Sequence, residues 1–139
     1  MKRAKEIELY QQIKEVREFG FGIFYFFKGG IIIAEIKDGV FFKPKDSRKT
    51  IKAAQEIYGV NYPLIYISNR VNRFYVFPFD WYKFYQDRHV MKHYAIVGKT
   101  KSGITSLIFE NLFFAKKFNH FNNLDEAVDW ALHISKKAH

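Results

Sequence analysis

The chain has 139 residues, of which 48% are hydrophobic and 19% are aromatic, and it contains no cysteine. This length suits a single domain, the apolar content argues against intrinsic disorder, and the lack of cysteine excludes disulfides, thiolate metal sites and cysteine nucleophiles. The formal net charge of +9 is compatible with an anionic partner, but the cations are spread along the chain, as on an ordinary solvated surface. With no apolar signal core and no apolar run of about 20 residues, a cytoplasmic protein is expected.

Residues 1–18 are predicted as an N-terminal extension of undecided structure, because their apolar positions fit a helix loosely and a short strand in part. The domain itself is predicted at 19–139. Its first strand is expected at 19–27, where large apolar residues alternate with a second face that includes two glycines. A Lys-Gly-Gly sequence then predicts a tight hairpin, and 31–36 returns as an antiparallel strand.

Glu35 lies within this second strand, and the sequence leaves its surroundings open. An exposed position is the favoured interpretation, because a carboxylate buried without a partner is strongly destabilising. The alternative is a buried carboxylate that pairs with Arg70 or accepts a hydrogen bond from Asn69. That alternative requires the two strands to be neighbours in the sheet.

The first helix is predicted from Asp46 to Tyr58. A proline precedes it, its Asp and Ser residues can cap free amide groups, and a glycine follows its last residue. Its first turns carry Arg48, Lys49 and Lys52, near the positive end of the helix dipole. Such a concentration of cations can attract an anionic partner, although chance remains the likelier cause.

A buried strand is predicted at 64–67, and polar residues follow it directly. Because α/β proteins tend to place ligands where strands end, we take the candidate ligand-binding residues from this region. The candidates are Glu35, Ser68, Asn69, Arg70, Asn72 and Trp81. The planar Arg70 guanidinium would hold a carboxylate or phosphate. The competing interpretation gives these residues structural roles, since Asn and Ser often tie off loops through backbone hydrogen bonds.

The second half of the chain continues the alternation of helices and strands. A short aromatic helix is predicted at 80–86, a strand at 93–98, a long helix at 103–116, a short strand at 118–121, and a final helix that Asn123 caps. His89 and His93 have the spacing of two helical metal ligands, but they straddle a helix–strand boundary and no acidic residue completes a metal-binding motif. Neither a metal site nor a cofactor is therefore predicted.

The long helix is apolar over much of its circumference, because three phenylalanines widen its main apolar stripe. These residues, Phe109, Phe113 and Phe114, are the candidate interface. Such a helix is either deeply buried or meets another subunit, as in a homodimer.

The order of elements predicts one α/β domain with a mixed, mostly parallel sheet of about five strands, an antiparallel first strand and about four helices. This order, with the segments Y-I-S-N-R-V-N, P-F-D-W-Y-K-F, G-I-F-Y-F-F and L-D-E-A-V-D-W-A, resembles the STAS domain family of sulfate transporters and anti-sigma-factor antagonists. It looks closest to uncharacterised members from Bacteroidetes-type bacteria, which are grouped with CRAL-TRIO lipid-binding domains. The resemblance covers roughly 19–131 and implies no enzymatic activity.

The chain departs from the family at its regulatory serine. In anti-sigma-factor antagonists, a serine after an aspartate at the start of the second major helix is phosphorylated. Around the matching place this chain has Phe77, Pro78, Phe79 and Asp80, with no serine. The phosphorylation switch is therefore not carried over, which argues against a sigma-factor role.

Three functions are compatible with these residues. The first is a non-catalytic regulatory or protein-interaction domain with an unidentified protein partner, since local motifs assemble no nucleophile–base set, phosphate loop or carboxylate pair. The second is a small-ligand or lipid-binding domain. In it Ser68, Asn69, Arg70 and Asn72 would donate hydrogen bonds, and Phe77 and Trp81 would line the pocket. Nucleic-acid binding ranks last: it rests on charge and on aromatic–basic neighbours such as Arg73-Phe74-Tyr75, without a known fold signature.

Overall fold

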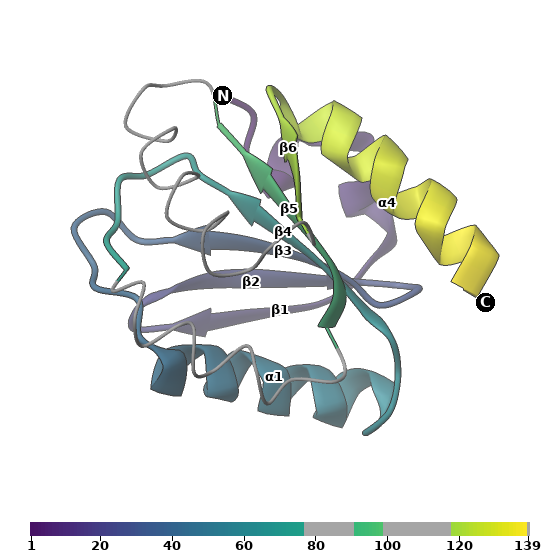
Figure 1. Ribbon diagram of the computed structural model, residues 1–139, viewed down its shortest axis with the longest axis horizontal. Helices are drawn as coiled ribbons and strands as arrows, with labels where there is room; N and C mark the ends of the chain where they lie inside the picture. Colours follow the sequence, from purple (N-terminus) through teal and green to yellow (C-terminus); the bar gives the residue numbers. More distant parts are fainter. Residues whose placement is uncertain (77–90, 99–117, 139) are drawn as a thin grey trace.

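The computed structural model describes residues 1–76, 91–98 and 118–138. Its centre is a six-stranded sheet whose strands follow chain order: β1 (Ile13–Phe19), β2 (Gly22–Phe27), β3 (Ile31–Ile36), β4 (Leu64–Asn69), β5 (Met91–Val97) and β6 (Phe118–Phe121). The first three strands form an antiparallel meander, and β3 to β6 run parallel (Figure 1). The predicted α/β class and mixed sheet are confirmed, with six strands in place of about five.

The additional strand comes from a hairpin that the sequence pattern conceals. A single strand at 19–27 is wrong, because the chain reverses at Gly20 and Phe21 and β1 pairs antiparallel with β2. The rings of Phe19 and Phe21 stack with centroids 5.1 Å apart, so the residue before the turn and the second residue of the turn keep their rings on one face. The alternation therefore continues through the turn and imitates one uninterrupted strand.

The N-terminal residues, whose structure the sequence left undecided, are part of the domain. They form two short 3-10 helices, η1 (Ala4–Glu6) and η2 (Glu8–Gln12), and then enter β1. The expected boundary between residues 18 and 19 falls inside that strand. The first strand begins at Ile13, so the chain joins the sheet six residues before position 19, where the predicted domain begins.

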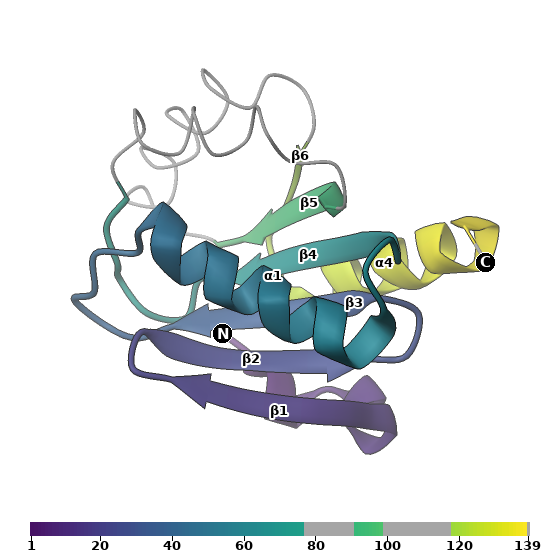
Figure 2. The same ribbon diagram turned by 90° about the horizontal axis from the view of Figure 1, so that it is seen from below.

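Two layers cover the sheet, one on each face (Figures 1 and 2). On one face α1 (Pro44–Tyr58) packs against the even-numbered residues of β2 and β3, through small side chains such as Ala53 and Ala54. On the other face α4 (Leu124–Ala138) and η1 pack against the odd-numbered residues, including Tyr25 and Ile33. Every residue of β3 and β4 is buried, as expected for central strands covered on both sides.

Local signals fix the ends of both α-helices that the structure describes. The Asp46 carboxylate accepts a hydrogen bond from the Lys43 amide at 3.1 Å, and Gly59, with φ of 108°, follows the last residue of α1. Asn123 caps α4 as predicted, because its Oδ1 accepts the Glu126 amide at 2.9 Å. Neither helix is both long and apolar enough to span a bilayer. The other two predicted helices, 80–86 and 103–116, lie outside the described residues.

The predicted hairpin between β2 and β3 is confirmed, and it requires glycine. Gly29 and Gly30 have φ angles of 87° and 79°, in the region that L-residues with side chains disfavour. The Gly30 carbonyl also accepts the Ile65 amide at 2.9 Å, which brings the hairpin against the start of β4. A side-chain carbon on Gly30 would collide with the carbonyl oxygen of Pro63. The close approach of the Pro63 carbonyl therefore requires glycine at position 30.

We expect Gly30→Ala to destabilise the protein by about 3 kcal/mol or more, because a positive φ strains alanine by about 1–3 kcal/mol and the collision moves backbone. Gly39→Ala is the matched control. Gly39 has φ of 77°, but no atom lies within 4 Å of the added carbon. The loss of stability in Gly39→Ala should therefore reflect backbone strain alone. Urea unfolding of both variants tests this expectation. An equal decrease in the free energy of unfolding would show that the contact with Pro63 does not contribute to the destabilisation.

Candidate functional site

The carboxyl ends of the four parallel strands meet at one edge of the sheet. The ligand-binding candidates that the structure describes all lie at this edge. The described strands follow chain order without a reversal, so they create no switch-point crevice of the kind that doubly wound sheets use for ligands. A site at this edge must therefore be argued from side-chain contacts.

Glu35 is buried, with 4% of its surface exposed, so the favoured exposed position is wrong. Its Oε2 accepts hydrogen bonds from Asn69 Nδ2 at 2.8 Å and from the Ala4 amide at 2.7 Å. The alternative prediction of a bond from Asn69 is confirmed, because β3 and β4 are parallel neighbours. These two donors compensate part of the hydration that the carboxylate loses on burial.

Asn69 connects the same strand ends to the N-terminus. Its Nδ2 also donates to the Lys2 carbonyl at 3.0 Å, so both amide hydrogens have acceptors and the orientation of the amide is fixed. The Lys2 ammonium in turn pairs with Asp125, in the first turn of α4, at 2.9 Å. We call Lys2, Ala4, Glu35 and Asn69 the N-terminal clamp. It joins β3, β4, the first residue of η1 and Lys2 before it.

The remaining polar candidates do not converge on the N-terminal clamp. Ser68 is buried beside Ala34, on the opposite face of the sheet, because side chains alternate along a strand. The Arg70 guanidinium lies over the Phe74 ring, with Cζ 4.7 Å from the centroid. Asn72 Nδ2 donates to the Ile36 carbonyl at 3.0 Å, which is the structural role that the competing interpretation gave it. The polar residues therefore form separate contacts.

Several other candidates fall outside the described residues. They are Trp81, the candidate interface residues Phe109, Phe113 and Phe114, and His89 of the histidine pair. His93 lies edge-on to the Trp130 ring of α4, with centroids 6.3 Å apart. In residues 1–76, 91–98 and 118–138, no three His, Asp or Glu side chains are grouped so that they could hold a metal ion.

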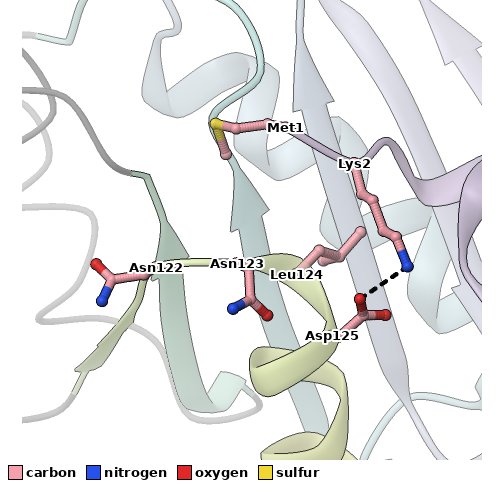
Figure 3. A pocket seen from close by; sticks show the side chains of 6 residues that line it. All are labelled: Met1, Lys2, Asn122, Asn123, Leu124 and Asp125. Atoms are coloured by element: carbon pink, nitrogen blue, oxygen red, sulfur yellow. Dashed lines mark hydrogen bonds and ion pairs between the residues drawn. The ribbon is translucent and has the colours of Figure 1, made fainter.

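A cavity of about 180 Å³ lies between the N-terminus and the turn from β6 to α4 (Figure 3). Its lining consists of Met1, Lys2, Asn122, Asn123, Leu124 and Asp125. Three of its polar side chains already have partners, because Lys2 pairs with Asp125 and Asn123 caps α4. The cavity is also smaller than the roughly 300–1,000 Å³ of usual ligand pockets. Its contacts stabilise the N-terminal segment.

A second feature of this edge involves the segments that leave β3 and β4. They run side by side, and an isolated parallel bridge joins Phe41 to Tyr75 (Figure 1). The Phe42 amide donates to the Tyr75 carbonyl at 2.8 Å, and the Tyr75 amide donates to the Val40 carbonyl at 2.8 Å. We call residues 39–43 and 73–75 the aromatic ribbon. Its backbone bonds hold two loops in one conformation.

The aromatic ribbon buries one face and exposes the other. Phe42 and Phe74 point toward the core under α1 and meet edge to face, with centroids 6.2 Å apart. Phe41 and Tyr75 keep 49% and 47% of their surfaces exposed, and their rings lie 5.2 Å apart. In the sequence these residues are only two pairs of adjacent aromatic residues, Phe41-Phe42 and Phe74-Tyr75. Their pairing depends on the adjacency of β3 and β4, which local pattern does not encode.

The N-terminal clamp also affects a tyrosine. Burial, together with the nearby negative charge of Glu35, raises the pKa of Tyr25 to about 12. Burial likewise raises the pKa of Tyr58, whose hydroxyl donates to the Phe27 carbonyl. Both hydroxyls are thus held in the neutral form well above physiological pH.

We expect Asn69→Ala to destabilise the protein by about 3 kcal/mol, because it removes one of the donors to a buried charge. Asn72→Ala is the matched control, since that half-buried amide makes a neutral bond and should cost about 1 kcal/mol. Only Asn69→Ala should accelerate hydrogen exchange at the Ala4 amide. Equal destabilisation by the two variants, with unchanged exchange at Ala4, would contradict the N-terminal clamp.

The raised pKa of Tyr25 predicts a loss of stability at alkaline pH. A phenol whose pKa is higher in the folded state than in the unfolded state ionises more readily after unfolding. Its stabilising effect is complete below about pH 10, the pKa of an unfolded tyrosine, and is lost as pH rises toward about 12. Urea unfolding at increasing pH should show a smaller decline for Tyr25→Phe than for the wild type. Identical declines would contradict the prediction.

Comparison with known proteins gives no assignment: no family model, no curated protein and no solved structure matches this chain.

Proposed function

We propose that this chain is a non-catalytic, STAS-like interaction domain that contacts its partner through the aromatic ribbon. The observation that carries the proposal is the exposure of Phe41 and Tyr75, which backbone hydrogen bonds hold side by side at the carboxyl edge of the sheet. Exposed aromatic surface of this kind is common where proteins bind partners. Tyrosine is enriched among the residues that dominate binding energy.

The rigidity of the aromatic ribbon supports a binding role. The Gly39 amide donates to the Arg73 carbonyl at 2.7 Å, and the Arg73 amide donates to Asp38 Oδ1 at 3.2 Å. With the two bonds at Tyr75, these contacts fix the backbone on both sides of the exposed rings. A surface that is already ordered loses less conformational entropy when it binds.

The polar residues of the same edge support the non-catalytic part of the proposal. Glu35 and Asn69 are buried in the N-terminal clamp, and Asn72 bonds the Ile36 carbonyl. A catalytic acid or base must reach its substrate, whereas these groups are committed to internal bonds. The alternative of a small-ligand or lipid site has less support, because Ser68 and Asn69 lie on opposite faces of the sheet.

The STAS-like part of the proposal rests on the order of elements and on the quoted segments. An antiparallel hairpin precedes a β-α-β unit, and the following described strands continue the parallel arrangement. The resemblance implies an antiparallel first strand followed by stacked β-α units, and the described arrangement supports the proposal to that extent. The segment Y-I-S-N-R-V-N, residues 66–72, contains the end of β4 and stops directly before residues 73–75 of the aromatic ribbon. This part of the resemblance therefore borders the proposed contact surface.

Site-specific photo-crosslinking tests the proposal. A photoreactive phenylalanine analogue at position 75 should give discrete adducts in cells of the source organism, identified by denaturing electrophoresis and mass spectrometry. Val60 is the control position, since it is 66% exposed and follows the opposite end of α1. Identical adducts at both positions, or none at position 75 in a protein that melts like the wild type, would refute a contact surface at the ribbon.

A further inference from the structure

Basic side chains bracket the exposed rings of the aromatic ribbon. Because side chains alternate along extended backbone, Arg73 belongs to the same face as Tyr75, and Lys43 to the same face as Phe41. Both cationic residues are exposed. In a parallel pair, Arg73 precedes the rings and Lys43 follows them. This face therefore presents a cation, two aromatic rings and a second cation in order.

The chain leaves the aromatic ribbon directly into the N-terminus of α1, which extends the positive surface. Its first turns add three exposed cationic residues, Lys45, Arg48 and Lys49. The amino end of a helix also carries a partial positive charge. The two carboxylates bonded to this surface, Asp38 and Asp46, accept the Arg73 and Lys43 amides, and they offset only part of the charge of the five cationic residues.

These features are complementary to a partner that has repeated negative charges and flat apolar faces. We propose that the aromatic ribbon binds single-stranded nucleic acid, with bases stacked on Phe41 and Tyr75 and phosphates held by Lys43, Arg73 and the start of α1. This inference rests on the proposed function and names the partner of that surface. Proteins that bind single strands without sequence preference combine aromatic side chains, on which bases stack, with rows of cationic side chains that contact the phosphates.

The alternative partners use these features less completely. An acidic peptide satisfies the cations but does not require a pair of adjacent rings. An anionic membrane draws aromatic side chains into its interface one by one, whereas the rings of Phe41 and Tyr75 lie 5.2 Å apart and tilt by 33° on a fixed backbone. A nucleic acid duplex keeps its base faces stacked inside. A single strand presents both phosphates and open base faces.

The structure also changes the residues on which nucleic-acid binding rests. The sequence drew attention to Arg73-Phe74-Tyr75, but Phe74 packs toward the core. Phe41 takes its place, because the parallel bridge sets it against Tyr75. The platform is thus formed by two segments far apart in the sequence, and its cations come from both.

Fluorescence anisotropy with the full chain and a labelled oligouridylate of about 12 nucleotides tests the inference. Phe41→Ala and Tyr75→Ala should each weaken binding about tenfold, whereas Tyr75→Phe keeps the ring and should retain affinity. Val60→Ala is the matched control and should bind like the wild type. Lys43→Gln and Arg73→Gln should each reduce the slope of log affinity against log salt by about 0.7.

Thermal unfolding of each variant separates lost binding from lost folding, since both rings are half exposed. The inference is wrong if no oligonucleotide binds at about 50 mM salt, or if binding is indifferent to both rings. It is equally wrong if vesicles containing phosphatidylserine or polyglutamate bind with ring dependence while the oligonucleotide does not. In that case, or if position 75 crosslinks only to protein, the proposed interaction domain is retained, but its partner is not a nucleic acid. If no probe binds and no adduct forms, both proposals fail.

Discussion

The constraint on which the structure depends is the buried carboxylate of Glu35. A charge between two central strands must be solvated by the protein itself, and here the donors are Asn69 from β4 and the Ala4 amide from the N-terminal segment. Neither donor is close to Glu35 in sequence. The carboxylate therefore fixes three things together: the register of β3 against β4, the path of the N-terminal segment, and its contact with α4 through the Lys2–Asp125 pair.

Sequence reasoning recovers those parts of the fold that short-range physics determines. The Gly29-Gly30 hairpin, the end of α1 at Gly59 and the Asn123 cap all depend on residues within one turn of the feature they create. The sequence pattern misses the hairpin at Gly20 for an equally local reason. Its turn residue Phe21 packs into the same cluster as the strands, so hydrophobic periodicity does not mark the reversal.

The candidate site was harder to predict, because it depends on which strands are neighbours. Burial of Glu35 is unfavourable in isolation and becomes acceptable only when Asn69 and Ala4 are brought to it. Proximity in sequence also groups residues that the sheet separates: Ser68 and Asn69 are consecutive, yet they face opposite layers. Conversely, Phe41 and Tyr75 are separated by the whole of α1 and still form a bridge.

The two features of the carboxyl edge follow from one arrangement of strands. Parallel pairing of β3 with β4 places Glu35 beside Asn69, and the segments that leave these strands pair once more, at the isolated bridge between Phe41 and Tyr75. The N-terminal clamp uses the polar residues at the strand ends, which removes them from solvent and stabilises the register. The aromatic ribbon begins where that register ends, so a rigid base holds its exposed rings in place. Because these buried contacts stabilise the fold, the half-exposed rings of Phe41 and Tyr75 can serve the binding role that we propose.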